Sequence, residues 1–221
     1  MRIFLGVFGV FLALAAAFGF QREYATAMTV RDTSFRVIEK LAADVPPRPI
    51  SWRGIRAVML ACHEAQTDAA LAFQPGAVRD SLMANCAASA RMVLAGAPTT
   101  SSAQLVLAAS ARHLDQPDMM VERLRLSQVT GPREGWLAAR RVNLITPHLE
   151  GVTPLGHEIW QRDVALLLEE RWGRTIVAEI FARNEALRPA IEDVVALMPN
   201  DAQRDFVALV RRAIQAQNAP F

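Results

Sequence analysis

The stretch "ARHLDQPDMMVERLRLSQVTGPREGW", residues 111–136, decides the fold class of this chain. It predicts a helix ending near Leu114, a turn in "DQPD", a second helix over residues 118–129, and a Gly-Pro break before a third helix. One helix pair cannot bury its apolar face alone, so such a pair is typical of a stack in which neighbouring pairs cover one another. We therefore interpret the stretch as one unit of a helical stack rather than as a catalytic segment.

The rest of the chain continues this helical pattern in both directions. No run of alternating β-branched residues indicates a strand. Apolar residues three and four positions apart, divided by proline and glycine breaks, predict further helices. They are expected from Ser51 onward and over residues 77–96, 102–114, 136–145, 157–172, 174–187, 189–197 and 202–215. The sequence thus predicts an all-α protein.

The spacing of large and small residues in residues 101–132 matches a known repeat in part. Leu107 and Ala108 are a large and small pair in the first helix, Leu124 and Ser127 are bulky and small in the second, and Pro132 follows. On these positions the segment from Ser101 to Pro132 resembles the tetratricopeptide repeat, a helix pair of about 34 residues. The resemblance implies an α-solenoid of antiparallel helix pairs whose concave face binds peptides or partner helices.

Three positions in this segment bear on how far the resemblance extends. Ala111 stands where the family prefers an aromatic residue, and Met120 stands where Ala is usual. Asp115 occupies the turn position that the family often gives to Gly. The earlier hairpin around Cys62 and Cys86 matches only in length and pattern, so a generic array of α-helical hairpins is the alternative.

The composition is that of a folded protein without a nucleic-acid footprint. The 221 residues are 52% apolar and 21% charged, with 24 basic and 22 acidic residues giving a net charge of +2. These charges are spread along the chain, whereas nucleic-acid binders concentrate Lys and Arg on one face. We therefore expect no nucleic-acid partner. Lys40 is the sole lysine and Ala is abundant, which indicates a GC-rich bacterial genome.

The N-terminus predicts a membrane segment. One Arg precedes an uncharged apolar run from Ile3 to Phe20, which as a helix would span roughly 27 Å, close to the hydrocarbon thickness of a bilayer. We expect residues 1–21 to be a transmembrane anchor. A cleaved secretory signal, with small residues at 15–17 or 25–27 for cleavage, is the main alternative, and a buried helix is the third.

Both leading interpretations export the rest of the chain, so we expect a single-pass protein of the bacterial inner membrane with a periplasmic domain. Arg2 on one side of the run is balanced by Arg22 and Arg31 on the other, so positive charge does not set the orientation. Cys62 and Cys86 are an even number of cysteines that would suit a disulfide in an oxidising compartment. Two buried free thiols are the alternative.

A proline-rich stretch divides the region that we expect to be exported into two parts. The stretch "VPPRPISW", residues 45–52, cannot continue a helix. We therefore expect residues 22–48 to be a helical stalk and proline-rich linker, and residues 49–217 to form the helical-repeat domain.

Known catalytic and metal-binding motifs are incomplete in this sequence. His157 and Glu158 begin a zinc-protease pattern, but Gln161 stands where the second His is required. Cys62, His63 and Cys86 lack a fourth ligand for zinc. There is no nucleophile-elbow motif and no phosphate-binding glycine loop. We expect no metal, cofactor or catalytic residue.

Four carboxylates near aromatic residues leave one enzymatic alternative open. Glycan hydrolases use paired carboxylates, and this alternative is an envelope glycan hydrolase or lyase with a cleft near Trp160 and Trp172. Its residues would be Glu158, Asp163, Glu169 and Glu170. Against it, Glu158 with Arg162 and Glu170 with Arg174 have the spacing of exposed helical ion pairs.

These observations favour a non-enzymatic scaffold that binds proteins, in the assembly of an envelope, secretion or polysaccharide-export complex. Since first helices line the inner face of a tetratricopeptide array, the resemblance implies partner contacts at Gln104, Arg112, His113 and Arg140. A third hypothesis makes the membrane helix itself the binding element, through the small residues Gly6, Gly9, Ala13 and Ala16.

Overall fold

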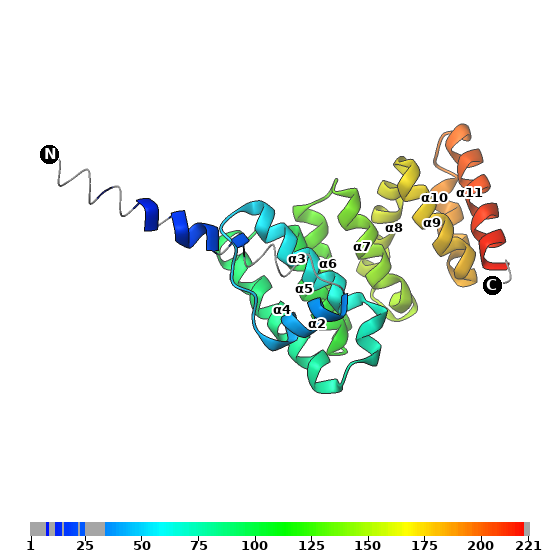
Figure 1. Cartoon of the computed structure of the whole chain (residues 1–221). Helices are drawn as coiled ribbons and strands as arrows, with labels where there is room; N and C mark the ends of the chain where they lie inside the picture. Colours follow the sequence, from blue (N-terminus) through cyan, green and yellow to red (C-terminus); the bar gives the residue numbers. More distant parts are fainter. Residues whose placement is uncertain (1–7, 9–11, 15, 22, 25–33, 219–221) are drawn as a thin grey trace. The chain divides into compact units, whose positions relative to one another are not determined.

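The computed structural model describes residues 8, 12–14, 16–21, 23–24 and 34–218. Over these residues every regular element is a helix, as Figure 1 shows, and there is no strand among them. The prediction of an all-α protein is therefore confirmed. Within the same ranges, no helix has the length and apolar character needed to cross a bilayer. Much of the expected anchor from Ile3 to Phe20 lies outside the described residues.

The helices fall into two compact units, which divide between Arg123 and Leu124. The first unit contains α2 (Ser34–Ala43), α3 (Trp52–Thr67), the 3₁₀ helix η1 (Ala69–Phe73), α4 (Gly76–Gly96) and α5 (Ser101–His113). The helix α6 (Pro117–Thr130) includes the division. The second unit contains α7 (Gly135–Ile145), η2 (Thr146–Gly151), α8 (Pro154–Glu169), α9 (Arg171–Arg183), η3 (Glu185–Leu187), α10 (Arg188–Val195) and α11 (Asn200–Asn218).

The core of the first unit lies where α2 packs on α4, α4 on α5, and α3 on α5. Each helix buries an apolar stripe, and the small residues of α4 and α5 allow close approach of their backbones. The larger buried side chains are Val37, Ile38, Leu41, Val58, Met59, Leu71, Leu82, Met83, Val93, Val106 and Leu107. The packing of these apolar helix faces against one another explains the fold of the first unit.

The segment expected as a stalk differs from that expectation. Val37, Ile38 and Leu41 of α2 are buried in the first core, against α4. Their spacing places them on one face of the helix, and the proline segment that follows returns the chain to α3. Residues 34–43 therefore belong to the folded unit, and the domain does not begin at residue 49. The helices expected over residues 49–217 are divided between two compact units, with the boundary within α6.

Local sequence signals account for the helix ends of the first unit. Ser51 is the N-cap of α3, as expected, and its hydroxyl accepts a hydrogen bond from the Gly54 N–H at 2.9 Å. After α5, Asp115 has a positive φ of 53°, and the Gln116 N–H donates to the Ala111 carbonyl at 3.0 Å. This pattern is a Schellman motif, which requires a left-handed residue at the turn. Asp tolerates that conformation better than most residues do.

The second unit is built on α8, which packs against α7, α9 and α10, while α9 packs against α11. Its core includes Leu137, Val142, Trp160, Val164, Leu167, Val177 and Phe206. We expected α8 to continue to Trp172, but it ends at Glu169 and α9 begins at Arg171. At this junction Gly173 lies so close to the backbone of Leu167 that a side chain would have no room.

Candidate partner-binding surfaces

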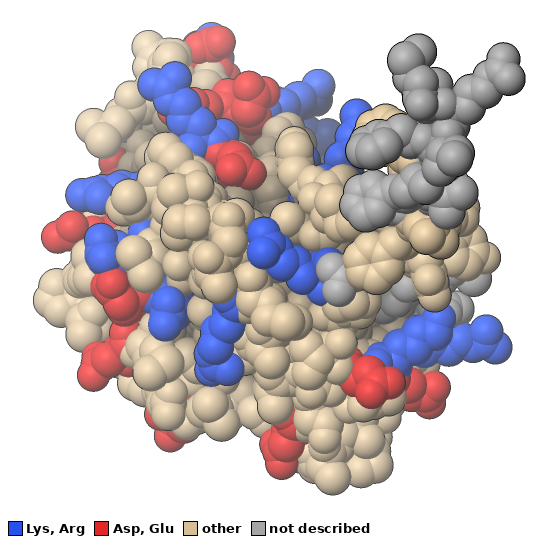
Figure 2. Space-filling view, turned by 90° about the vertical axis from the view of Figure 1, so that its left-hand side faces the viewer, with Lys and Arg blue, Asp and Glu red and all other residues tan. Residues whose placement is uncertain are grey.

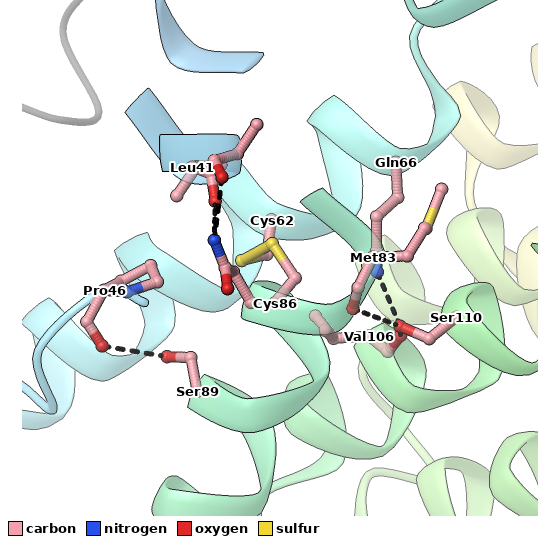
Figure 3. Close-up of a disulfide and its surroundings, with 11 residues drawn as sticks. Leu41, Pro46, Cys62, Gln66, Met83, Cys86, Ser89, Val106 and Ser110 are labelled. Carbon is pink, nitrogen blue, oxygen red and sulfur yellow. Dashed lines mark hydrogen bonds between the residues drawn. A yellow bond between two sulfur atoms is a disulfide. The ribbon is translucent and has the colours of Figure 1, made fainter. Parts of the chain in front are cut away.

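A disulfide joins α3 to α4 within the first unit. Cys62 and Cys86 are fully buried, and their Cα atoms are 5.6 Å apart (Figure 3). The bond closes a loop with a sequence separation of 24 residues. The structure thus pairs the two cysteines in the way that the sequence led us to expect, and neither one is a free thiol.

Buried hydrogen bonds surround the disulfide and connect three helices. The Gln66 side chain in α3 donates from Nε2 to the Ser110 hydroxyl in α5 at 2.8 Å. The Ser110 hydroxyl lies 3.2 Å from the Val106 carbonyl and 3.3 Å from the Met83 carbonyl in α4, as Figure 3 shows. These neutral contacts satisfy the Gln66 Nε2 group and the Ser110 hydroxyl, which would otherwise be costly to bury, whereas Gln66 Oε1 is buried without a hydrogen-bond partner among the described residues.

Side chains of α4 also form hydrogen bonds with the end of α2 and with the proline segment that follows it. The Asn85 amide donates from Nδ2 to the carbonyls of Leu41 and Ala42, each at 3.0 Å. Further along α4, the Ser89 hydroxyl donates to the Pro46 carbonyl at 3.5 Å (Figure 3). The end of α2 and the first proline after it are therefore attached to the same helix that carries Cys86.

The four residues expected to contact a partner lie in different environments. Gln104 is buried, and its Oε1 accepts a hydrogen bond from Arg123 Nη1 at 3.1 Å. It is therefore inaccessible to a partner. Arg112 and His113 are half-buried neighbours at the end of α5. Arg140 belongs to α7 in the second unit, where its guanidinium lies 5.4 Å from the centre of the Trp136 ring.

The environments of Arg112 and His113 limit the contacts that their side chains can make with a partner. Burial lowers the pKa of the Arg112 guanidinium, because a charge is disfavoured away from water. His113 Nε2 lies 2.9 Å from Asp80 Oδ1 on α4, and this contact joins α4 to α5. Both side chains thus take part in the internal structure of the first unit, although each keeps some exposure.

Two of the four carboxylates of the glycan-enzyme alternative lie far apart on one helix. Glu158 and Glu169 lie near opposite ends of α8, eleven positions apart, so their Cα atoms are separated by about 16 Å along the helix axis. Glycosidases hold their carboxylates roughly 5 to 9.5 Å apart. Glu158 faces Arg162 at 3.6 Å, as its spacing predicts, but Arg174 bonds to Asp205 at 3.1 Å rather than to Glu170.

Asp163, the fourth carboxylate, has a structural environment that the sequence did not indicate. It is buried against Arg141 of α7, and its two oxygens accept hydrogen bonds from Nε and Nη2, each at 2.7 Å. Arg141 also donates from Nη1 to the Ser127 hydroxyl at 3.3 Å. Nearby Trp160 is buried and donates from Nε1 to the Thr146 hydroxyl at 3.0 Å. These are packing and pairing contacts rather than the walls of a substrate cleft.

A groove of about 520 Å³ lies between α8, α10 and the start of α11 in the second unit. Its apolar lining includes Leu168, Val194, Leu197 and Met198. Leu197 is 87% exposed, although it is a large aliphatic residue. Sequence reasoning missed this groove, because Leu197 looks like one more core position at the end of a short amphipathic helix.

The turn that carries Leu197 is held in place by hydrogen bonds. The Gln203 side chain of α11 donates from Nε2 to the Met198 carbonyl at 2.8 Å and lies 3.3 Å from the Ala196 carbonyl. The Leu197 N–H also donates to the Val194 carbonyl at 3.2 Å. The exposed leucine therefore stands on a constrained turn rather than on a free loop.

A second groove, of about 470 Å³, lies between α9 and α11. It is lined by the cationic residues Arg171, Arg183 and Arg212, and by Glu179. Glu179 lies 3.4 Å from Arg183 one turn further along α9, so part of the positive charge is neutralised. On the face shown in Figure 2, basic and acidic side chains are interspersed among uncharged residues.

Metal ligands are not grouped in the described part of the chain: no cluster of three or more His, Cys, Asp or Glu residues there could hold an ion. Comparisons of the chain with models of protein families, with curated proteins and with solved structures find no match. The geometry of its own residues therefore carries the functional argument.

Proposed function

We propose that this protein is a membrane-anchored periplasmic scaffold of tetratricopeptide-like helix pairs, and that it binds a partner protein through the groove beside Leu197. The observation that carries the proposal is the 87% exposure of Leu197 on a constrained turn next to an apolar groove. A large exposed apolar side chain beside other apolar side chains is typical of an interaction site. The partner would cover this side chain.

Charges around the groove favour one kind of partner segment. Glu169 and Asp201 stand among its lining residues, and both are exposed. Arg174 also lines the groove, but its Nε donates to Asp205 Oδ2 at 3.1 Å. The groove therefore suits a helix or peptide that has an apolar stripe flanked by Lys or Arg, since helix-in-groove recognition places apolar anchors between complementary charges.

The proposed role in assembly combines this groove with a membrane anchor that places the helical domain in the periplasm. A scaffold fixed to the inner membrane by residues 1–21 would hold its partner close to the membrane, as envelope, secretion or polysaccharide-export complexes require. The helical fold and the dispersed carboxylates support binding over glycan chemistry.

Affinity purification of the full-length protein from its native membranes in detergent tests the proposal. Leu197→Gln removes the apolar anchor, and Val129→Gln is the matched control, because Val129 is 63% exposed on α6 and does not line the groove. Burying a leucine contributes about 1.5–3 kcal/mol, so we expect L197Q to weaken recovery of the partner by roughly tenfold to a hundredfold. The V129Q protein should recover it at the wild-type level.

Cross-linking mass spectrometry on the same complexes should place the partner beside α10 and α11. Equal recovery by L197Q and wild type would show that the groove is not the binding site. If replacing Gly9 and Ala13 with Leu abolished recovery while L197Q did not, the binding function would belong to the membrane helix instead.

A further inference from the structure

The end of the N-terminal segment is hydrogen-bonded to the first unit through Glu23. Its Oε1 accepts from the backbone N–H groups of Ile50 at 2.9 Å and Ser51 at 2.7 Å, and its Oε2 accepts from the Ser51 hydroxyl at 2.8 Å. These donors stand at the N-terminus of α3, where a carboxylate is favoured by the helix dipole. The Ser51 hydrogen bonds lower the pKa of the Glu23 carboxyl, so it is charged at neutral pH.

Two glycines show that this contact is close. A side chain at Gly54, in the first turn of α3, would meet Glu23 Oε2 at 2.6 Å, so the carboxylate occupies the space above that turn. A Cβ atom at Gly19 would lie 3.8 Å from Ile50 Cδ1, which is van der Waals contact. Residues 19 and 23, one helical turn apart, therefore both lie against the start of α3.

Large apolar side chains are exposed at this same place. Ile50 is 59% exposed and Trp52 is 67% exposed, directly on either side of Ser51. On the N-terminal segment, Phe20 is 71% and Tyr24 is 55% exposed, and their rings stack with centroids 5.9 Å apart. Exposed Trp and Tyr beside the end of an apolar segment are the residues that membrane proteins place at the headgroup level.

Basic residues accompany these aromatic side chains. Arg53 is exposed next to Trp52, and the Arg56 guanidinium lies 5.6 Å from the centre of the Trp52 ring. Arg48 is also exposed, in the proline segment before α3, but its guanidinium lies against Gly96 at the end of α4. Cations at the membrane surface are attracted to anionic lipid headgroups. The start of α3 thus combines apolar, aromatic and cationic groups.

We propose that Trp52, Arg53 and Arg56 at the start of α3, together with Ile50 just before the helix, lie in the lipid headgroup layer of the membrane that holds the anchor, so that the first unit rests on the bilayer. The inference rests on the proposed anchor from Ile3 to Phe20. If that run crosses the hydrocarbon, Glu23 lies just outside it, and the groups bonded to Glu23 lie at the same depth. Trp52 and Ile50 would then be covered by lipid.

Fluorescence quenching by bromine-labelled lipid tests this placement in the full-length protein. The protein is reconstituted in phosphatidylcholine and phosphatidylglycerol vesicles with brominated acyl chains, and flotation of the vesicles reports its attachment. The chain has 4 Trp residues. We expect Trp52→Phe to remove most of the quenching and Trp172→Phe, the matched control at a 47% exposed residue of the second unit, to leave it unchanged.

The outcomes separate the inference from the proposed function. Flotation with equal quenching in wild type and W52F would overturn the surface placement while the anchor stands. A protein that does not float with the vesicles would overturn the anchor, and the surface placement would fall with it.

A second variant tests the role of Glu23 as the positioning residue. Glu23→Ala removes the acceptor for Ile50 and Ser51 but leaves the apolar run intact. We expect the variant to float like wild type while the quenching of Trp52 falls by half or more. The control Glu39→Ala changes an exposed carboxylate on α2 and should alter neither readout. Unchanged quenching in E23A would show that Glu23 does not position the surface.

Discussion

The two units of this protein stabilise their interiors by different chemistry. The first unit has a disulfide between Cys62 and Cys86, with neutral hydrogen bonds from Gln66 and Ser110 around it. The second has no cysteine in its sequence and instead buries the ion pair of Arg141 with Asp163. The stability of the first unit therefore depends on the redox state of its surroundings, whereas that of the second depends on keeping two charges together.

The disulfide and the buried ion pair also act on different states of the chain. In the chain-entropy account, a disulfide stabilises by restricting the unfolded chain. A buried ion pair acts within the folded state, where each charge compensates the desolvation of the other. Loss of one partner therefore costs more than the pair contributes, because the remaining charge stays buried.

The largest effect is expected from breaking the ion pair on one side. Asp163→Ala leaves the Arg141 guanidinium buried without its carboxylate. We expect the free energy of unfolding of the second unit to fall by about 3–5 kcal/mol. Native-state hydrogen exchange, read by mass spectrometry on peptides of α7 and α8, measures this loss, and peptides of α3 and α4 should exchange as in wild type.

A double variant sharpens this prediction. Replacing Arg141 and Asp163 together with Met and Leu removes both charges, and we expect most of the lost stability to return, because apolar residues can fill such a site. If the double variant were as unstable as D163A, packing rather than an uncompensated charge would explain the loss.

The next effect is expected from removing the disulfide. In the double variant Cys62→Ala, Cys86→Ala, no covalent bond joins these two positions, which are 24 residues apart in the sequence. We expect the first unit to lose about 3 kcal/mol, measured by hydrogen exchange in α3 and α4. The C62V/C86A variant restores most of the volume without a crosslink, so recovery of the stability there would assign the effect to packing instead.

The smallest effect is expected at the turn between α5 and α6. Asp115 adopts a φ of 53°, a conformation that is free of steric penalty for Gly. We expect Asp115→Gly to raise the stability of the first unit by up to about 1 kcal/mol, and Asp115→Val to lower it. Chemical denaturation followed by circular dichroism measures both, and a loss of stability in D115G would show that the Asp side chain contributes through its own contacts.

The helices, the N-cap at Ser51 and the special turn at Asp115 were open to prediction from the sequence. Each depends on residues within one or two turns of one another, and the cap and the turn lie where local rules place them, although α8 and α9 meet about three residues earlier than expected. The candidate partner contacts were harder to predict from the sequence. Gln104 was expected to face a partner but is buried against Arg123, because its exposure depends on how α5 packs.

The all-α class and most helix boundaries follow from the sequence alone, since periodicity, caps and breaks act over short distances along the chain. Tertiary packing explains why α2 belongs to the core, why Arg141 meets Asp163, and why Leu197 stands exposed beside a groove. These features depend on which helix faces meet. Residues 22 positions apart, such as Arg141 and Asp163, become neighbours through packing rather than through any local pattern.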